Sequence, residues 1–168
     1  EQGQTCSAMT VDALFERAWL RYQHHYRVIN GQFADVYPGV LTALQAFADR
    51  GLPMACLTNK PLSFAQSLLK EKSLDTFFSH VFGGDSFEHK KPHPLPILKT
   101  CEALGIAPKN VLMVGDSSND AQAAHAAGCP VVLVTYGYNH GQPVQDTPAA
   151  AWLDTLAQLP ACVSVKSP

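Results

Sequence analysis

The residues Val-Leu-Met-Val-Gly-Asp-Ser-Ser-Asn-Asp, numbered 111–120, decide how this chain is expected to fold. Residues 111–114 are a short apolar run that predicts a buried strand, and residues 120–127 predict a helix that Gly128 ends. Residues 131–135 predict a second buried strand. A strand, a helix and a strand in this order are typical of a parallel sheet covered by helices on both faces, so the predicted fold class is α/β.

The rest of the chain continues the alternation. A helix is predicted from Thr10, which is its cap, to about residue 29, and a shorter one follows Tyr37-Pro38-Gly39. Further strands are predicted at 54–58 and 80–82, and further helices at 62–72, 94–104 and from Thr147-Pro148 to about 159. Together these elements predict a Rossmann-like parallel sheet flanked by helices.

Composition excludes several classes of protein. The chain has 168 residues, 46% of them hydrophobic and 15% charged, so it is expected to form a packed core rather than a disordered segment. Its net charge is −2, and it has no basic run of the kind that binds nucleic acid. No apolar run approaches the roughly 20 residues that span a bilayer, so no membrane partner is expected. Five cysteines without a C-x-x-C pair suit the reducing cytosol, so a cytoplasmic protein is predicted.

Polar residues follow the predicted strands. Thr58 and Asn59 come after the strand at 54–58, Lys91 lies in the loop after the strand at 80–82, and Asp116 follows the strand at 111–114. Ligands of open parallel sheets bind at the carboxyl ends of the strands. These side chains are therefore expected to converge on one edge of the sheet.

Asp116 and Asp120 are the candidate metal ligands. They lie four residues apart where a strand gives way to a helix, and carboxylate oxygens that leave room for water suit Mg²⁺. The competing interpretation is that Asp120, like Ser117 or Asn119 beside it, only caps the helix. Asp116, which directly follows Gly115 at the strand end, is harder to explain as a cap.

Lys91, Thr58 and Asn59 are the candidate phosphate-binding residues. Lys91 precedes a proline, which favours an extended backbone and leaves its ammonium group able to reach back across the sheet edge. The Thr58 hydroxyl and the Asn59 amide can both donate to a phosphate oxygen. With Mg²⁺, this set matches phosphoryl transfer, which depends on positioning and charge neutralisation. Because no nucleotide-binding glycine loop is present, a phosphatase is favoured.

The motifs resemble those of the haloacid dehalogenase superfamily of phosphatases. Thr58 with Asn59 resembles the second motif, Lys91 in Lys-Pro-His-Pro the third, and Gly-Asp-Ser-Ser-Asn-Asp at 115–120 the fourth. The resemblance covers about residues 37–159. Three segments look most like those of bacterial phosphoglycolate phosphatases, namely 58–61, 90–94 and 135–139.

One family motif is absent. The family's first motif, D-x-D-G-T, carries the attacking aspartate and the acid/base aspartate on a central strand, and the sequence has no such segment. The resemblance implies that residues 1–36 are the C-terminal part of a helical cap and that residues 37–168 are a core domain without its first strand. We expect this chain to be a fragment of a longer protein, with two sheet edges left unpaired.

The resemblance implies a Mg²⁺-dependent phosphatase that hydrolyses a small phosphorylated metabolite, 2-phosphoglycolate to glycolate, in carbohydrate metabolism. In that scheme Thr58, Asn59 and Lys91 bind the phosphoryl group, Lys91 also neutralises the missing nucleophile, and Asp116 and Asp120 serve the metal. Two alternatives remain: a non-catalytic binding module on the same scaffold, and a phosphatase or phosphomutase for another sugar phosphate. The sequence predicts no oligomeric state.

Overall fold

The computed structural model describes residues 10–163, in two compact units that divide after Ala34. The described residues of the first unit contain one long helix, α1 (Val11–Ile29). Thr10 precedes this helix in an extended conformation, and its side-chain oxygen accepts a 3.2 Å hydrogen bond from a first-turn amide. The predicted helix and its threonine cap are confirmed.

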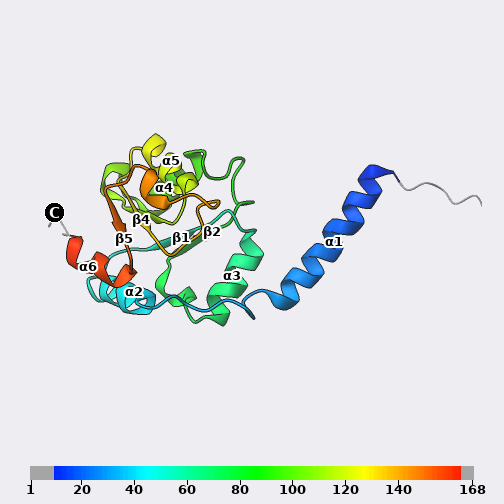
Figure 1. The fold of residues 1–168 in the computed structure, drawn as a ribbon, viewed down its shortest axis with the longest axis horizontal. Coiled ribbons are helices and arrows are strands. Elements are labelled where there is room, and N and C mark those ends of the chain that lie inside the picture. The colour runs from blue at the N-terminus through cyan, green and yellow to red at the C-terminus, as the bar shows by residue number, and fades with distance from the viewer. Residues whose placement is uncertain (1–9, 164–168) are drawn as a thin grey trace, which may run out of the picture. The chain divides into compact units, whose positions relative to one another are not determined.

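The second unit, from Asp35 onward, alternates strands and helices along the chain, as Figure 1 shows. Its strands are β1 (Ala55–Leu57), β2 (His80–Phe82), β3 (Met113–Gly115), β4 (Val131–Val134) and β5 (Ala151–Leu153). Its α-helices are α2 (Val40–Asp49), α3 (Leu62–Glu71), α4 (Leu95–Leu104), α5 (Ser118–Ala127) and α6 (Leu159–Cys162). Short 3₁₀ turns lie at Asp75–Phe77, Pro108–Asn110, Val144–Asp146 and Leu156–Gln158.

The strands form two separate parallel sheets. One contains β1 and β2, and the other has the order β3-β4-β5. Within the described residues, β1 pairs only with β2 and β3 pairs only with β4. The α/β class and the parallel pairing are confirmed. The missing first strand is expected to lie between β1 and β3. Within residues 10–163 the outer edges of these two strands have no strand partner, and neither do those of β2 and β5.

Strand β4 is the centre of the hydrophobic core. All four of its residues are buried, and their side chains alternate between the two faces of the sheet. Val131 and Leu133 pack among the apolar residues of α4 and α5. Val132 packs with Leu153 and Leu159 on the other face, next to Phe47 of α2. The three-stranded sheet is therefore covered by helices on both faces, as its continuously apolar strand predicted.

The predicted helix from Thr147-Pro148 to about residue 159 is wrong. The chain there forms strand β5, with Leu133 paired to Trp152, and then short helical turns. Leu153 contributes to the core, and the Trp152 indole nitrogen donates to two loop carbonyls at 3.2 Å. Pairing with the buried strand β4 and burial of an apolar side chain outweigh the local helix-start signal of Thr147-Pro148. The same two residue types can also precede a short strand.

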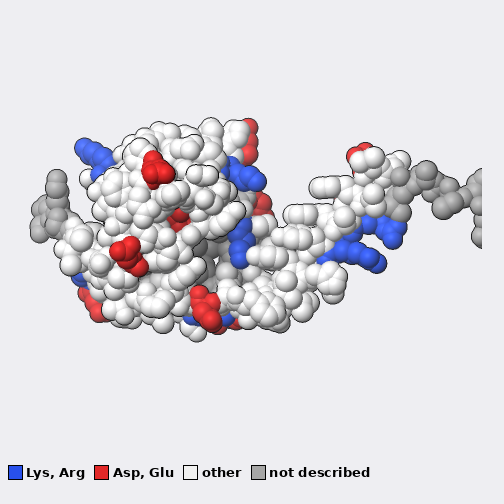
Figure 2. Space-filling view, in the orientation of Figure 1, with Lys and Arg blue, Asp and Glu red and all other residues white. Residues whose placement is uncertain are grey.

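On the face of the second unit shown in Figure 2, acidic and basic side chains occur singly or in small groups among uncharged residues. None of the helices within residues 10–163 has the length and apolar character needed to cross a bilayer.

Candidate active site

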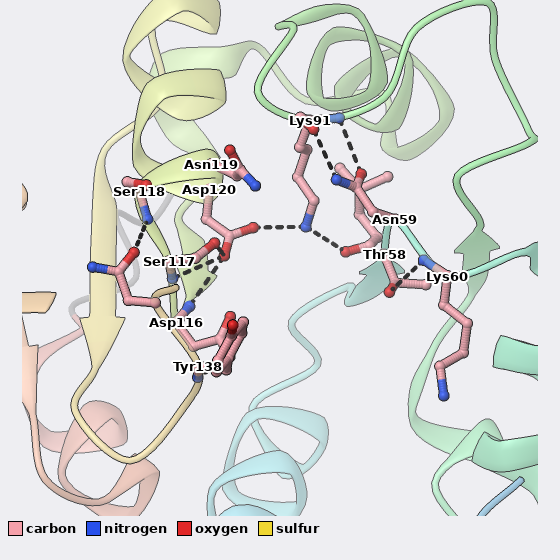
Figure 3. Close-up of polar contacts among 12 residues, drawn as sticks. Thr58, Asn59, Lys60, Lys91, Asp116, Ser117, Ser118, Asn119, Asp120 and Tyr138 are labelled. Atoms are coloured by element: carbon pink, nitrogen blue, oxygen red, sulfur yellow. Dashed lines mark hydrogen bonds and ion pairs between the residues drawn. The ribbon is translucent and has the colours of Figure 1, made fainter. Parts of the chain in front are cut away.

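Lys91 lies at the centre of the candidate site (Figure 3). The residue is only 8% exposed. The ammonium nitrogen donates to an Asp120 carboxylate oxygen at 2.7 Å and to the Leu57 carbonyl at 2.9 Å. Lys91 lies outside α4 and reaches back to the end of β1, as predicted. Because an unpaired buried charge is strongly unfavourable, these two acceptors make the buried position possible.

The Leu57 carbonyl belongs to the unpaired edge of β1. The next residue, Thr58, donates its amide to Phe82 on the β2 side at 3.0 Å. Since backbone groups of successive residues in a strand point to opposite sides, the Leu57 carbonyl points away from β2. The Lys91 ammonium therefore satisfies a carbonyl that would otherwise face the open edge.

The Asp120 carboxylate satisfies a backbone amide at the unpaired edge of β3. Met113 donates its amide to Pro130 on the β4 side at 2.9 Å, so the alternation places the Asp116 amide on the opposite, open side. That amide donates to the second Asp120 oxygen at 3.1 Å. The Lys91–Asp120 ion pair thus connects the open edge of one sheet to the open edge of the other.

Asp120 has both carboxylate oxygens occupied. It is 4% exposed, and the oxygen that accepts from the Asp116 amide also accepts from the Ser117 amide at 3.2 Å and the Ser117 hydroxyl at 2.8 Å. Burial by itself would raise the pKa of Asp120, but the Lys91 charge and these hydrogen bonds outweigh burial, so its pKa is lowered. Asp120 is consequently an anion that both caps α5 and holds Lys91.

Asp116 has a different environment. It is half-buried, and one carboxylate oxygen, Oδ2, accepts the Tyr138 amide at 2.9 Å. Within residues 10–163, the hydrogen bonds of this carboxylate involve only Oδ2. Mg²⁺ often binds to one or two carboxylates and keeps several waters, so an Asp116 carboxylate with one uncommitted oxygen fits such an ion. Asp120, with both oxygens occupied, fits a contact through water better than direct ligation.

Asn59 fixes the backbone of Lys91. Its side-chain nitrogen donates to the Lys91 carbonyl at 2.7 Å, and its side-chain oxygen accepts the Lys91 amide at 3.0 Å. The neighbouring Thr58 hydroxyl oxygen accepts the Lys60 amide at 3.2 Å, which leaves the hydroxyl proton available to donate. Both polar atoms of the Asn59 side chain therefore bond to Lys91, while its backbone amide is the group predicted to bind phosphate.

The structure brings the five predicted site residues into one region of the second unit. Hydrogen bonds connect Asn59 to Lys91, Lys91 to Asp120, and Asp120 to Asp116, and Thr58 directly precedes Asn59 at the end of β1. The expected convergence at the carboxyl ends of the strands is confirmed. The chemical role of each residue remains a prediction.

Two further residues shape the site: Ser117, which the sequence offered only as an alternative helix cap, and Asn139, to which it assigned no role. Ser117 binds Asp120 as described, and the S-x-x-D spacing of a helix N-terminus was the signal that could have identified this pair. Asn139 is buried in the loop after β4 and accepts the Ser118 amide at 2.8 Å. No local pattern distinguishes Asn139 from an ordinary loop asparagine, because its partner lies 21 residues away.

Two curated relatives of this chain are phosphoglycolate phosphatases. The chain is 46% identical over 146 residues to a phosphoglycolate phosphatase of Thiobacillus denitrificans, which covers 87% of this chain and 64% of that protein. It is 45% identical over 123 residues to the phosphoglycolate phosphatase of Escherichia coli K12, covering 73% of this chain and 49% of the relative. The chain therefore spans about half to two thirds of the length of these curated relatives.

Solved structures show the same likeness. A crystal structure of a predicted phosphoglycolate phosphatase from Haemophilus somnus matches with a TM-score of 0.86 and 36% identity, covering 92% of this chain and 68% of that one. The resemblance that the sequence motifs suggested is thus confirmed. A family model described as haloacid dehalogenase-like hydrolase also matches residues 5–128, and with this match the chain belongs to the haloacid dehalogenase-like hydrolase family.

Proposed function

We propose that this chain is part of a Mg²⁺-dependent phosphatase that hydrolyses a small phosphate monoester, with 2-phosphoglycolate as substrate and glycolate as product. One observation carries the proposal: the Lys91 ammonium lies between the end of β1, where Thr58 and Asn59 stand, and the Asp116–Asp120 turn after β3. The names of the relatives support the substrate.

Thr58, Asn59 and Lys91 would bind the phosphoryl group. The Thr58 hydroxyl and the Asn59 amide donate to its oxygens, and the ammonium of Lys91 neutralises their charge. Lys91 is held ready for this role because Asn59 fixes its backbone at two points and Asp120 fixes its charge. Preorganised donors of this kind need no rearrangement during the reaction.

Asp116 would hold the Mg²⁺ ion through its uncommitted oxygen, with Asp120 contributing through water. When bound, the ion supplies positive charge that polarises the phosphoryl oxygens. Asp120 keeps its negative charge at neutral pH because its pKa is lowered, so it continues to pair with Lys91.

The attacking carboxylate would come from a strand between β1 and β3. The carboxylate of Asp120 is already bonded to Lys91, and the edges of β1 and β3 are unpaired within residues 10–163. An aspartate there would attack phosphorus, displacing the substrate alcohol, which takes a proton from an acid. Water would then cleave the resulting aspartyl phosphate, returning the carboxylate and releasing inorganic phosphate.

The test compares this chain with a version extended at its N-terminus by any coding sequence found directly upstream in its gene. The extended protein should release phosphate from 2-phosphoglycolate, and chelation of Mg²⁺ with EDTA should abolish the reaction. In the extended protein, Asp116→Asn should lower kcat by at least about 100-fold, and the exposed control Asp146→Asn should leave it unchanged.

The alternatives predict different results. An extended protein that releases no phosphate from any small phosphate ester would contradict the phosphatase and favour a binding module. Release from sugar phosphates but not from 2-phosphoglycolate would replace the proposed substrate. Activity of the 168-residue chain alone, at the rate of the extended protein, would refute the proposed source of the nucleophile.

A further inference from the structure

Asn139 is a buried residue whose side-chain oxygen and side-chain nitrogen both form hydrogen bonds. The residue is 8% exposed, and its side-chain oxygen accepts the Ser118 amide in the first turn of α5 at 2.8 Å. Its nitrogen donates to the Gln142 carbonyl at 3.2 Å and the Pro143 carbonyl at 3.5 Å. Asn139 therefore closes the loop at residues 135–143 on itself and fastens it to α5.

The same loop contacts Asp116 at two consecutive residues. The Tyr138 amide donates to Asp116 Oδ2 at 2.9 Å. A Cβ atom at Gly137 would overlap with the Cβ and Oδ2 atoms of Asp116, so the loop backbone lies directly against this carboxylate. The position of the loop therefore decides how the Asp116 carboxylate is turned.

We propose that Asn139 is a positioning residue for Asp116. By fastening the loop to α5, it holds the Tyr138 amide on Oδ2 and leaves Oδ1 for a divalent cation. The inference rests on the proposed function only in giving Asp116 a cation to bind. Residues that orient a metal-binding carboxylate by a hydrogen bond are commonly worth about 10- to 100-fold in metal affinity.

The first readout needs no metal. In ¹H–¹⁵N spectra of the full 168-residue chain, the Tyr138 amide should resonate downfield because it is bonded to a carboxylate. Asp116→Ala removes the acceptor and gives the resonance position of the unbonded amide. Asn139→Ala should move the Tyr138 resonance most of the way to that position. The control Gln142→Ala removes an exposed amide side chain from the same loop and should leave the resonance in place.

The second readout is binding of Mn²⁺ alone, followed by the loss of the free-ion signal in electron paramagnetic resonance. Asn139→Ala should weaken Mn²⁺ binding by about 10-fold or more, and Gln142→Ala should not change it. Asn139→Asp keeps the acceptor for Ser118 but loses the donor to Gln142 and Pro143, so an intermediate effect on both readouts is expected. This variant also serves if Asn139→Ala does not give a dispersed spectrum.

The outcomes separate the two proposals. If the variants at Asn139 keep the wild-type Tyr138 resonance, or keep the wild-type Mn²⁺ affinity, Asn139 does not position Asp116. If the wild-type chain binds no Mn²⁺, Asp116 does not hold a divalent cation in this chain, and that part of the proposed function is refuted. The Tyr138 resonance then decides the positioning role by itself.

Discussion

The Lys91 ammonium nitrogen lies 2.7 Å from a carboxylate oxygen of Asp120, and the two side chains are only 9% and 6% exposed. Each partner also binds a backbone group at the open edge of a different sheet, Leu57 for Lys91 and Asp116 for Asp120. One buried ion pair therefore links the β1-β2 sheet to the β3-β4-β5 sheet at the candidate site. Stability and site geometry are coupled through this pair.

Replacement of Asp120 should destabilise the fold. Asp120→Asn leaves the Lys91 ammonium buried without its counter-charge, so we expect the free energy of unfolding to fall by about 3 kcal/mol at pH 7. Glu102→Gln is the matched control, because it breaks the exposed Lys99–Glu102 ion pair of the same 2.7 Å length and should cost less than about 1 kcal/mol. Urea unfolding followed by circular dichroism measures both. Equal losses would show that the buried pair contributes no more than a surface pair.

The stability difference between wild type and Asp120→Asn should depend on pH. The pKa of Asp120 is lower in the folded chain than its ordinary value of about 3.9, so the folded state favours the charged form. The stabilisation is therefore fully present above about pH 4 and is lost as pH falls through the folded-state pKa. Unfolding curves of the two proteins at a series of pH values should converge in acid. A constant difference across the series would contradict this assignment.

Replacement of Asn59 should loosen the Lys91 backbone. Asn59→Ala removes two hydrogen bonds to one residue, and we expect a loss of about 1 to 3 kcal/mol in unfolding free energy. Gln45→Ala removes an exposed amide that bonds to Asp49 in α2, and it should change stability by less than about 0.5 kcal/mol. Hydrogen exchange of the Lys91 amide should accelerate in Asn59→Ala and stay at the wild-type rate in Gln45→Ala. No change in that exchange would mean that Asn59 does not hold the loop.

Gly115 should not tolerate a side chain. A Cβ atom there would overlap with the side chain of Asp120, so Gly115→Ala should cost about 3 kcal/mol and displace the carboxylate that holds Lys91. Gly51 has a φ of +66° and no atom near its Cβ position, so Gly51→Ala should cost only the backbone strain of about 1 to 2 kcal/mol. Thermal unfolding compares the two. A smaller loss at Gly115 than at Gly51 would refute the close packing of Asp120.

Cys129 should resist alkylation in the folded chain. Burial, together with the Cys101 thiol at 3.9 Å, raises the pKa of Cys129 to about 12. Because the thiolate is the reactive form, only about one molecule in 10⁴ is reactive at pH 8. Exposed Cys162 should therefore react with iodoacetamide much faster, which mass spectrometry of peptides resolves. Urea should abolish the difference, and equal rates without urea would show that the core around Cys129 opens readily.

The sequence by itself determined the order and type of nearly all elements before residue 135. Apolar runs such as Val131–Val134 indicate buried strands because the strands of a doubly covered parallel sheet are apolar on both faces. Gly128 ends α5 with a φ of +76°. It also predicted that Lys91 and Asp116 would lie in one region, because the carboxyl ends of parallel strands share one edge, and Asp120 links the two residues. These are local signals, or direct consequences of a single topological rule.

Only the tertiary structure decided the rest. Ala151–Leu153 became a strand because β4 offered a partner far along the chain, which local helix signals do not report. The hydrogen bonds of the Asn59, Asp120 and Asn139 side chains likewise depend on partners that packing brings together. A hydrogen bond between distant residues is set by backbone positions to within fractions of an ångström, and residue identity alone leaves those positions open.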